Sequence, residues 1–202
     1  MEEQVNFDER GLVPCVVQDA STGEVLTLAY MNAEALERTR ATGEVHLFSR
    51  SRGELWHKGE TSGNVQRVRA LRVDCDRDAV VALVDPDGPA CHTGERTCFF
   101  RGDTDPVPGE ALAALERTIS ERRAADREAA GPSYTRELLA DPPRSGEKVR
   151  EEADEVARAA AEESDERVRE EAADVLYHLG VLLAARDLSF ADAFAELNAR
   201  RR

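Results

Sequence analysis

The chain has 202 residues, of which 41% are hydrophobic and 34% are charged, and its formal net charge is −14. This length allows one large domain or two small ones, and the apolar share is sufficient for a packed core. The negative charge argues against nucleic acid or an anionic membrane surface as a partner. Any phosphate ligand must therefore be held by local basic groups or by a metal ion.

The sequence also predicts where the protein works. Its first residues show neither the basic segment nor the apolar segment of a secretion signal, and the longest apolar run, residues 79–84, is too short to cross a membrane. We therefore expect a cytoplasmic protein. In that reducing compartment, the four cysteines are expected to be thiols or metal ligands rather than disulfides.

Residues 1–104 alternate short β-rich segments with turn residues. Strands are predicted at residues 14–18, 25–30, 45–49, 65–73 and 79–84, and a short helix at residues 32–41 with Asn32 as its N-cap. This pattern indicates an α+β domain rich in antiparallel strands.

Residues 105–110 are rich in Pro, Gly and Asp and are expected to form a linker. From residue 111 to 202 the sequence turns helical. One predicted helix carries Leu112, Leu115 and Ile119, a second begins near Gly146, a third has an apolar stripe over residues 168–183, and a last starts at about Ser189. The second half is therefore expected to be an all-α helical bundle.

The first candidate site combines carboxylates with a thiol at Asp74, Cys75, Asp76 and Asp78. In an extended segment, the three aspartates would face one way and Cys75 the other, and the aspartates could share one cation only if the segment curved. Oxygen ligands suit Mg²⁺ or Ca²⁺ and a thiolate suits Zn²⁺, so the cluster indicates two different metals. An EF-hand is excluded because its glycine and final glutamate are missing. A solvated acidic strand end remains the alternative.

Two further cysteines, Cys91 and Cys98, are too far apart in sequence for a structural zinc ribbon. Together with Cys75 they would supply three thiolates and leave a fourth zinc position open, which is the catalytic pattern. Zinc lowers the pKa of a bound water to about 7. His92 is then a candidate proton shuttle, whereas Cys15 is interpreted as a small buried hydrophobe.

Residues 55–64 form a segment rich in glycine and hydroxyl groups around Lys58, which could bind an oxyanion such as phosphate. An ordinary hairpin turn is the alternative. Lys58 and Lys148 are the only lysines among 27 basic residues, so each position, unless it arises by chance, requires a compact ammonium.

Residues 56–63, 74–78 and 91–98 together closely resemble phosphoribosyl-AMP cyclohydrolase, over about residues 11–102. The resemblance implies Mg²⁺ on Asp74, Asp76 and Asp78 and Zn²⁺ on Cys75, Cys91 and Cys98. It also implies a homodimer in which both chains contribute to each zinc site. The reaction would be zinc-hydroxide opening of the adenine ring between N1 and C6, which is chemically akin to nucleobase deamination.

Within this resemblance we assign roles to the remaining motif residues. The expected catalytic residues are His92, Lys58 and Glu60. The expected substrate-binding residues are Trp56, Lys58, Gly59, Thr61, Ser62 and Gly63.

The second half carries carboxylates at helical spacing. Glu151 and Glu155 share one helix face with Glu152 alongside, and Glu171 and Asp174 share a face of the next helix. Packed antiparallel, the two helices would bring four or five carboxylates together, and Mg²⁺ or Mn²⁺ is the natural occupant. Glutamate-rich helix faces are more often simply solvated, and that alternative stays open on composition alone.

Residues 133–138, 148–152 and 174–179 resemble the all-α nucleoside-triphosphate pyrophosphatases, and more closely phosphoribosyl-ATP pyrophosphatase, over about residues 111–202. The resemblance implies that fold, Mg²⁺ on these acids and a substrate-binding role for Lys148. Arg150 stands where that family usually has a small residue.

The two resemblances imply consecutive hydrolyses in histidine biosynthesis. The helical domain would convert phosphoribosyl-ATP to phosphoribosyl-AMP and pyrophosphate, and the α+β domain would then open the ring. One rival is a general nucleotide pyrophosphatase with a zinc-binding appendage, which would not need residues 56–64. The other is a zinc-stabilised interaction module without turnover.

Overall fold

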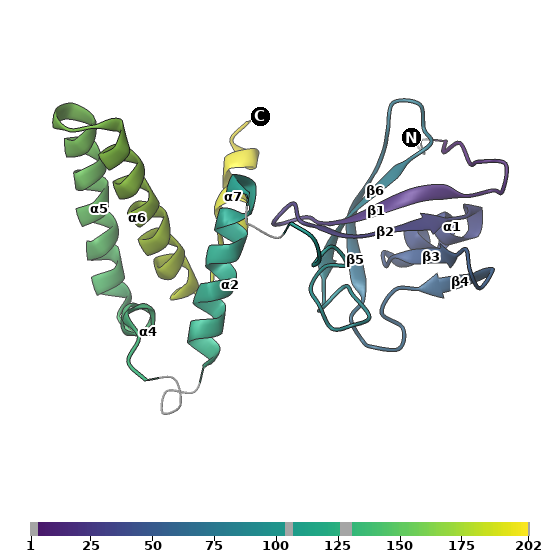
Figure 1. Cartoon of the computed structure of the whole chain (residues 1–202), viewed down its shortest axis with the longest axis horizontal. Helices are drawn as coiled ribbons and strands as arrows, with labels where there is room; N and C mark the ends of the chain where they lie inside the picture. The colour runs from purple at the N-terminus through teal and green to yellow at the C-terminus, as the bar shows by residue number, and fades with distance from the viewer. Residues whose placement is uncertain (1–3, 104–106, 126–130, 202) are drawn as a thin grey trace. The chain divides into compact units, whose positions relative to one another are not determined.

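The computed structural model describes residues 4–103, 107–125 and 131–201, in two compact units that divide between residues 105 and 106 (Figure 1). Each unit has its own cluster of buried side chains. Of the predicted linker, residues 105 and 106 lie outside the described residues, and Pro108–Glu110 form a short 3-10 helix, η1.

The first unit is built on a six-stranded sheet with the order β4-β3-β2-β1-β6-β5. Its strands are β1 (Val13–Asp19), β2 (Val25–Met31), β3 (His46–Ser49), β4 (Glu54–His57), β5 (Gln66–Val73) and β6 (Val80–Pro86). Neighbouring strands are antiparallel except β1 and β6, which run parallel. The predicted α+β class is confirmed, and the sheet is mixed rather than purely antiparallel.

Two details of the predicted strands were wrong. No strand is predicted at residues 55–57, but they belong to β4, where Trp56 pairs with Leu47 of β3. The glycine and hydroxyl residues that follow are typical of a loop or turn, and they outweigh the weak strand pattern of these three residues. Strand β6 continues two residues beyond its predicted end because Asp85 and Pro86 still pair with β5.

Helix α1 (Ala33–Thr42) follows β2, and its predicted N-cap is confirmed. The Asn32 side chain accepts a hydrogen bond of 2.8 Å from the Ala35 amide. Gly43 ends the helix at φ 71°, a left-handed conformation that glycine adopts without a Cβ clash.

The sheet curls, so that the segment before β3 meets the start of β5. Glu44 and Arg67 form an isolated antiparallel bridge. The Val45 amide donates to the Gln66 carbonyl at 3.0 Å, and the Val68 amide donates to the Gly43 carbonyl at 2.7 Å. This curl brings together chain segments that lie about twenty residues apart.

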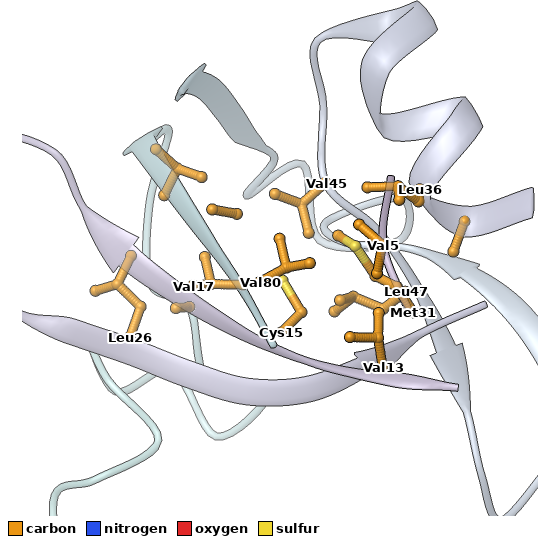
Figure 2. Close-up of a cluster of buried hydrophobic side chains, with 14 residues drawn as sticks. Val5, Val13, Cys15, Val17, Leu26, Met31, Leu36, Val45, Leu47 and Val80 are labelled. Atoms are coloured by element: carbon orange, nitrogen blue, oxygen red, sulfur yellow. The ribbon is translucent and has the colours of Figure 1, made fainter. Parts of the chain in front are cut away.

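The core of the first unit lies on one face of the curled sheet (Figure 2). Val13, Cys15 and Val17 point inward at alternate positions of β1, and all three are fully buried. The prediction that Cys15 is a buried apolar side chain is confirmed. Burial raises the pKa of its thiol to about 12, so the thiol stays protonated near neutral pH.

The second unit is helical, which confirms its predicted class. Its described helices are α2 (Ala111–Ala124), α4 (Tyr134–Leu139), α5 (Pro142–Glu162), α6 (Asp165–Ala184) and α7 (Phe190–Ala199). The two longest, α5 and α6, pack side by side as an antiparallel hairpin (Figure 1). None of the described helices is both long and apolar enough to cross a bilayer.

The ends of these helices follow capping chemistry. Helix α5 begins at Pro142 rather than near Gly146, because the Asp141 side chain accepts from the Arg144 amide at 3.2 Å and proline is tolerated in a first turn. The predicted N-cap of α7 is confirmed, since the Ser189 side chain accepts from the Asp192 amide.

The inward face of α6 is partly polar. The core of this unit centres on Ile119, Leu138 and Val181. In contrast to the predicted apolar stripe, Leu176 is 42% exposed, while Glu171 and His178 of the same helix are buried. Polar side chains at buried positions require partners.

Candidate functional site

The acidic loop of the first unit lies directly after β5. The strand ends at Val73, and the chain bends through residues 74–79 with Arg77 at φ 70°. The segment is therefore curved, which is the condition stated above for the three aspartates to share one cation. The curved loop places carboxylate oxygens of Asp74, Asp76 and Asp78 within 4.8 Å of one another, although all three side chains are exposed. A single divalent cation could contact all three.

The charges in this loop affect one another. The negative charge of Asp76, followed by interactions with Asp74, raises the pKa of the Asp78 carboxyl above its usual value. Desolvation opposes ionisation of Asp74, but hydrogen bonds, first from the Ala79 amide, lower its pKa overall. Such mutual repulsion favours a bound cation.

The cysteines form a second cluster. A hydrogen bond from Thr93 lowers the pKa of the Cys91 thiol, whereas burial raises that of Cys98, and the two thiols also interact with each other. Cys75 lies in the acidic loop, with its Sγ 3.9 Å from Asp76 Oδ1. Within the described part of one chain, Cys75 does not join Cys91 and Cys98 in a group of ligand atoms within 4.8 Å.

The loop between the two cysteines is anchored by Arg96. Its guanidinium pairs with Asp19 Oδ2 at 2.6 Å and also with Glu24. The Asp19 side chain is only 3% exposed. Burial opposes ionisation of Asp19, but hydrogen bonds from Ser21 and Thr22 and the charge of Arg96 lower its pKa overall. His92 is exposed on this loop, and its Nδ1 lies 3.9 Å from Cys91 Sγ.

Lys58 faces the cysteines from the end of β4. It is only 6% exposed, and its Nζ lies 5.5 Å from the centre of the Trp56 ring. Burial lowers the pKa of its ammonium, and the charges of Cys98 and Cys91 partly offset this effect. Burial of an ammonium that interacts with two thiols makes Lys58 a candidate residue of a functional site.

The rest of this segment is a tight loop. Gly59 has φ 94°, and a Cβ there would lie 2.4 Å from the Asn64 backbone, so no other residue fits. The Gly63 amide donates to the Gly59 carbonyl at 2.8 Å. The predicted catalytic residue Glu60 and the predicted substrate-binding residues Thr61, Ser62 and Gly63 are all exposed.

In the second unit, helices α5 and α6 bring three glutamates together. Carboxylate oxygens of Glu152, Glu155 and Glu171 lie within 4.8 Å of one another. Their side chains are 12%, 32% and 5% exposed, respectively. The predicted residues Glu151 and Asp174 are outside this group, and both are exposed.

Basic side chains surround these glutamates. Lys148 Nζ lies 2.7 Å from Glu151 and 3.2 Å from Glu152, and the interaction with Glu151 is the main reason that the pKa of Lys148 is raised. Arg158 lies 3.3 Å from Glu155, and Arg167 pairs with Glu171. The chain itself therefore neutralises much of the cluster.

Sequence reasoning assigned no role to His178, which is buried beside this cluster. Its Nε2 lies 3.5 Å from Glu152 Oε1, and its ring contacts the Tyr134 and Tyr177 rings edge-on. Burial lowers its pKa, against the opposing charge of Glu152. The signal available in the sequence was a histidine one turn after Asp174, on the same helix face.

A cavity of about 420 Å³ in the second unit contains none of the predicted site residues. Its lining includes Arg123, Asp187 and Ser189. Arg123 pairs with Asp187 at 2.7 Å, and Ser189 caps α7. These polar groups already have structural partners.

Comparison with known proteins divides the chain in the same way. Residues 27–100 match the family described as phosphoribosyl-AMP cyclohydrolase, and residues 112–201 match phosphoribosyl-ATP pyrophosphohydrolase. The "Histidine biosynthesis bifunctional protein HisIE" of Bacillus subtilis (strain 168) is 47% identical over 98% of this chain and 95% of its own length. The protein of the same name from Thermus thermophilus is 50% identical (98% and 92%), and that from Pyrococcus furiosus is 45% identical (99% and 97%).

Proposed function

The chain belongs to the family of bifunctional histidine-biosynthesis enzymes that join a cyclohydrolase domain to a pyrophosphohydrolase domain, and on that premise we propose how each unit performs its reaction. One observation carries the proposal. Each matched unit holds three carboxylates within 4.8 Å, close enough to share a divalent cation. The second unit acts first, because its product is the substrate of the first unit.

In the second unit, water cleaves the phosphoanhydride bond of phosphoribosyl-ATP to release pyrophosphate and phosphoribosyl-AMP. Glu152, Glu155 and Glu171 would hold Mg²⁺, for which oxygen ligands are the preferred set. Bound there, the cation supplies positive charge to the leaving pyrophosphate. Lys148 Nζ lies 3.2 Å from Glu152 Oε1, where it could contact a phosphate group bound beside the glutamates. Glu151 and Asp174, the exposed acids beside this group, would complete the metal-binding set.

In the first unit, water adds to C6 of the adenine ring of phosphoribosyl-AMP and the bond between N1 and C6 breaks. Asp74, Asp76 and Asp78 fit Mg²⁺, and the thiols fit Zn²⁺. Zinc held by cysteines supplies an acidified water as the nucleophile when it is bound.

The side chains around the cysteines then assist the reaction. The Lys58 ammonium is held beside Cys91 and Cys98, where it can stabilise developing negative charge. His92 adjoins Cys91 and would carry the proton to the departing ring nitrogen. Glu60 would act as a further catalytic residue, and the loop hydroxyls of Thr61 and Ser62 would bind and orient the substrate.

The zinc site is proposed to lie between two chains of a homodimer. Supporting this, Cys91 and Cys98 interact within one chain while Cys75 stays outside their group. A partner chain can supply the third thiolate. Free thiols as metal ligands suit a reducing cytoplasm, which is where we place the enzyme.

The decisive experiment is incubation of purified protein with phosphoribosyl-ATP, Zn²⁺ and Mg²⁺. We expect release of pyrophosphate followed by the absorbance change of ring opening. Ordinary nucleoside triphosphates serve as the comparison substrates. If they are hydrolysed equally well and phosphoribosyl-AMP is not opened, the chain is a general pyrophosphatase and the proposal is wrong.

A further inference from the structure

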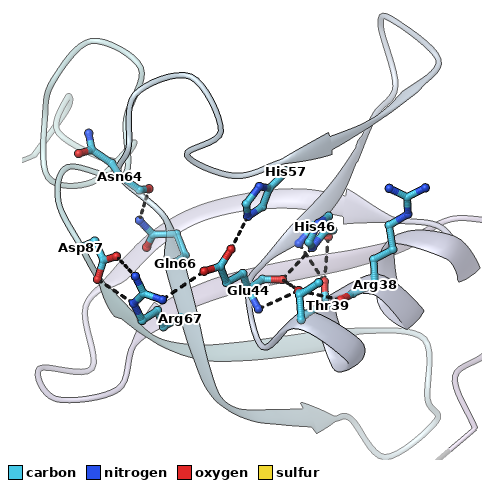
Figure 3. Close-up of polar contacts among 10 residues, drawn as sticks. Arg38, Thr39, Glu44, His46, His57, Asn64, Gln66, Arg67 and Asp87 are labelled. Atoms are coloured by element: carbon cyan, nitrogen blue, oxygen red, sulfur yellow. Dashed lines mark hydrogen bonds and ion pairs between the residues drawn. The ribbon is translucent and has the colours of Figure 1, made fainter.

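Both ends of the loop that follows β4 are tied to one carboxylate. The loop runs from Lys58 to residue 65, between His57 at the end of β4 and Arg67 near the start of β5. His57 Nε2 lies 2.9 Å from Glu44 Oε2, and Arg67 Nη1 lies 3.1 Å from Glu44 Oε1 (Figure 3). Glu44 thus contacts the residues that flank the loop on either side.

The two contacts of the Glu44 carboxylate differ in geometry. Arg67 donates a hydrogen bond to it, whereas the N–H of His57 lies close to the carboxylate but does not point well at its oxygen. A second interaction compensates for this. The rings of His46 and His57 stack with centroids 4.5 Å apart and planes 10° apart, which fixes the orientation of His57. His46 is held in turn by its Nδ1, 2.9 Å from the Glu44 carbonyl.

The anchor extends to the neighbouring backbone. The Lys58 amide donates to the Val45 carbonyl at 2.9 Å, directly after Glu44. Arg67 also pairs with Asp87 at 2.6 Å. The Asp87 amide donates to the Val65 carbonyl at 3.0 Å. The loop is therefore fixed at its base while the side chains at its tip remain exposed.

We propose that Glu44 is a positioning residue for the cyclohydrolase reaction, which sets the geometry of the Lys58 loop against the substrate. This inference rests on the proposed role of that loop in binding phosphoribosyl-AMP. The Arg67 side chain is 56% exposed, so its ion pair with Glu44 adds little to folding stability. The contacts of Glu44 instead orient the Lys58 loop, and reaction rates are sensitive to displacements of about one ångström.

The test compares kinetic constants for phosphoribosyl-AMP. Glu44→Ala should raise KM about tenfold, because the loop then binds both ground state and transition state less well. Glu44→Gln keeps a hydrogen-bond acceptor for Arg67, so its KM should lie between those of Glu44→Ala and wild type. Zinc content and the thermal unfolding midpoint should stay at the wild-type values in both variants.

The matched control is Glu34→Ala. Glu34 lies in the first turn of α1 and forms an exposed ion pair with Arg38 at 2.7 Å. The KM of the Glu34→Ala variant for phosphoribosyl-AMP should equal that of wild type. If wild type opens the ring and Glu44→Ala has a KM within about twofold of wild type, the inference is wrong. Should the Ala variant not fold, the same criterion applies to Glu44→Gln. An inactive wild type would instead refute the proposed function.

Discussion

The two acidic clusters of this chain each bring three carboxylates within 4.8 Å of one another but differ in how they are built. Asp74, Asp76 and Asp78 come from five consecutive residues of one exposed loop. The glutamate cluster comes from two helices, and each member has a basic neighbour: Lys148 beside Glu152, Arg158 beside Glu155 and Arg167 beside Glu171. Proximity of acids along the sequence needs only a bend, whereas proximity between helices needs neutralisation within the fold.

This difference predicts how the clusters respond to a cation. In the aspartate loop, repulsion from Asp76 and Asp74 already raises the pKa of Asp78. A bound cation would therefore relieve the repulsion between these carboxylates. In the helical cluster, a cation would compete with Arg158 and Arg167 for the same carboxylates. Basic side chains therefore already neutralise much of the helical cluster, whereas the carboxylates of the aspartate loop still repel one another.

The largest expected effect is on the helical cluster. Glu155→Ala should reduce pyrophosphate release more than about 100-fold, since removing an outer-shell group alone costs 10–100-fold and a ligand should cost more. Ring opening of phosphoribosyl-AMP should be unaffected. Glu162→Ala, an exposed glutamate on the same helix, is the control. Loss of both activities in a folded Glu155→Ala protein would contradict two independent sites.

A second prediction concerns the zinc site, which, unlike the two acidic clusters, is proposed to be formed by two chains. Cys75→Ala and Cys91→Ala should each abolish ring opening. After subunit exchange, one hybrid site keeps all three thiolates, and the random mixture should recover about a quarter of wild-type activity. Heterodimers that form but remain inactive would refute the shared site.

Lys58→Arg tests whether the buried ammonium contributes to chemistry. The larger planar guanidinium does not reproduce a compact charge at a position that is 6% exposed. We expect a loss of about tenfold in kcat/KM for ring opening, or about 1.4 kcal/mol of transition-state stabilisation. Pyrophosphate release is the internal control. Wild-type ring-opening kinetics would show that lysine is dispensable there.

The smallest effect concerns Asp19, a carboxylate that the first unit does neutralise, through Arg96. Asp19→Asn should lower the free energy of unfolding by about 1–2 kcal/mol at neutral pH, because a charge-assisted hydrogen bond is lost. The folded-state pKa of Asp19 is lowered, so its contribution is full above the ordinary pKa of about 3.9 and is lost as the pH falls through the folded value.

Urea unfolding from pH 7 to pH 3 measures this contribution. The difference between wild type and Asp19→Asn should be constant down to about pH 5 and shrink below about pH 4. Ser21→Ala, which removes one hydrogen bond to the same carboxylate, should give a smaller difference. A difference that does not vary with pH would show that the Asp19 charge does not stabilise the fold.

The division into two units, the class of each unit and the motifs of both candidate sites could all be predicted from the amino-acid sequence alone. Strand alternation placed β1 and β2, and side-chain caps placed the starts of α1 and α7, because these features depend on neighbouring residues alone. Strand β4 was not predicted, because it runs directly into a segment rich in glycine and hydroxyl residues that is typical of a loop.

Which of the candidate residues lie close together depends on the three-dimensional fold. The bend after β5 gathers Asp74, Asp76 and Asp78, which an extended strand would have held apart. The packing of α5 on α6 selects Glu152, Glu155 and Glu171 and leaves Glu151 and Asp174 at the rim. The curl of the sheet places Glu44 against both His57 and Arg67. These contacts join residues far apart in the chain, and no local propensity encodes such distances.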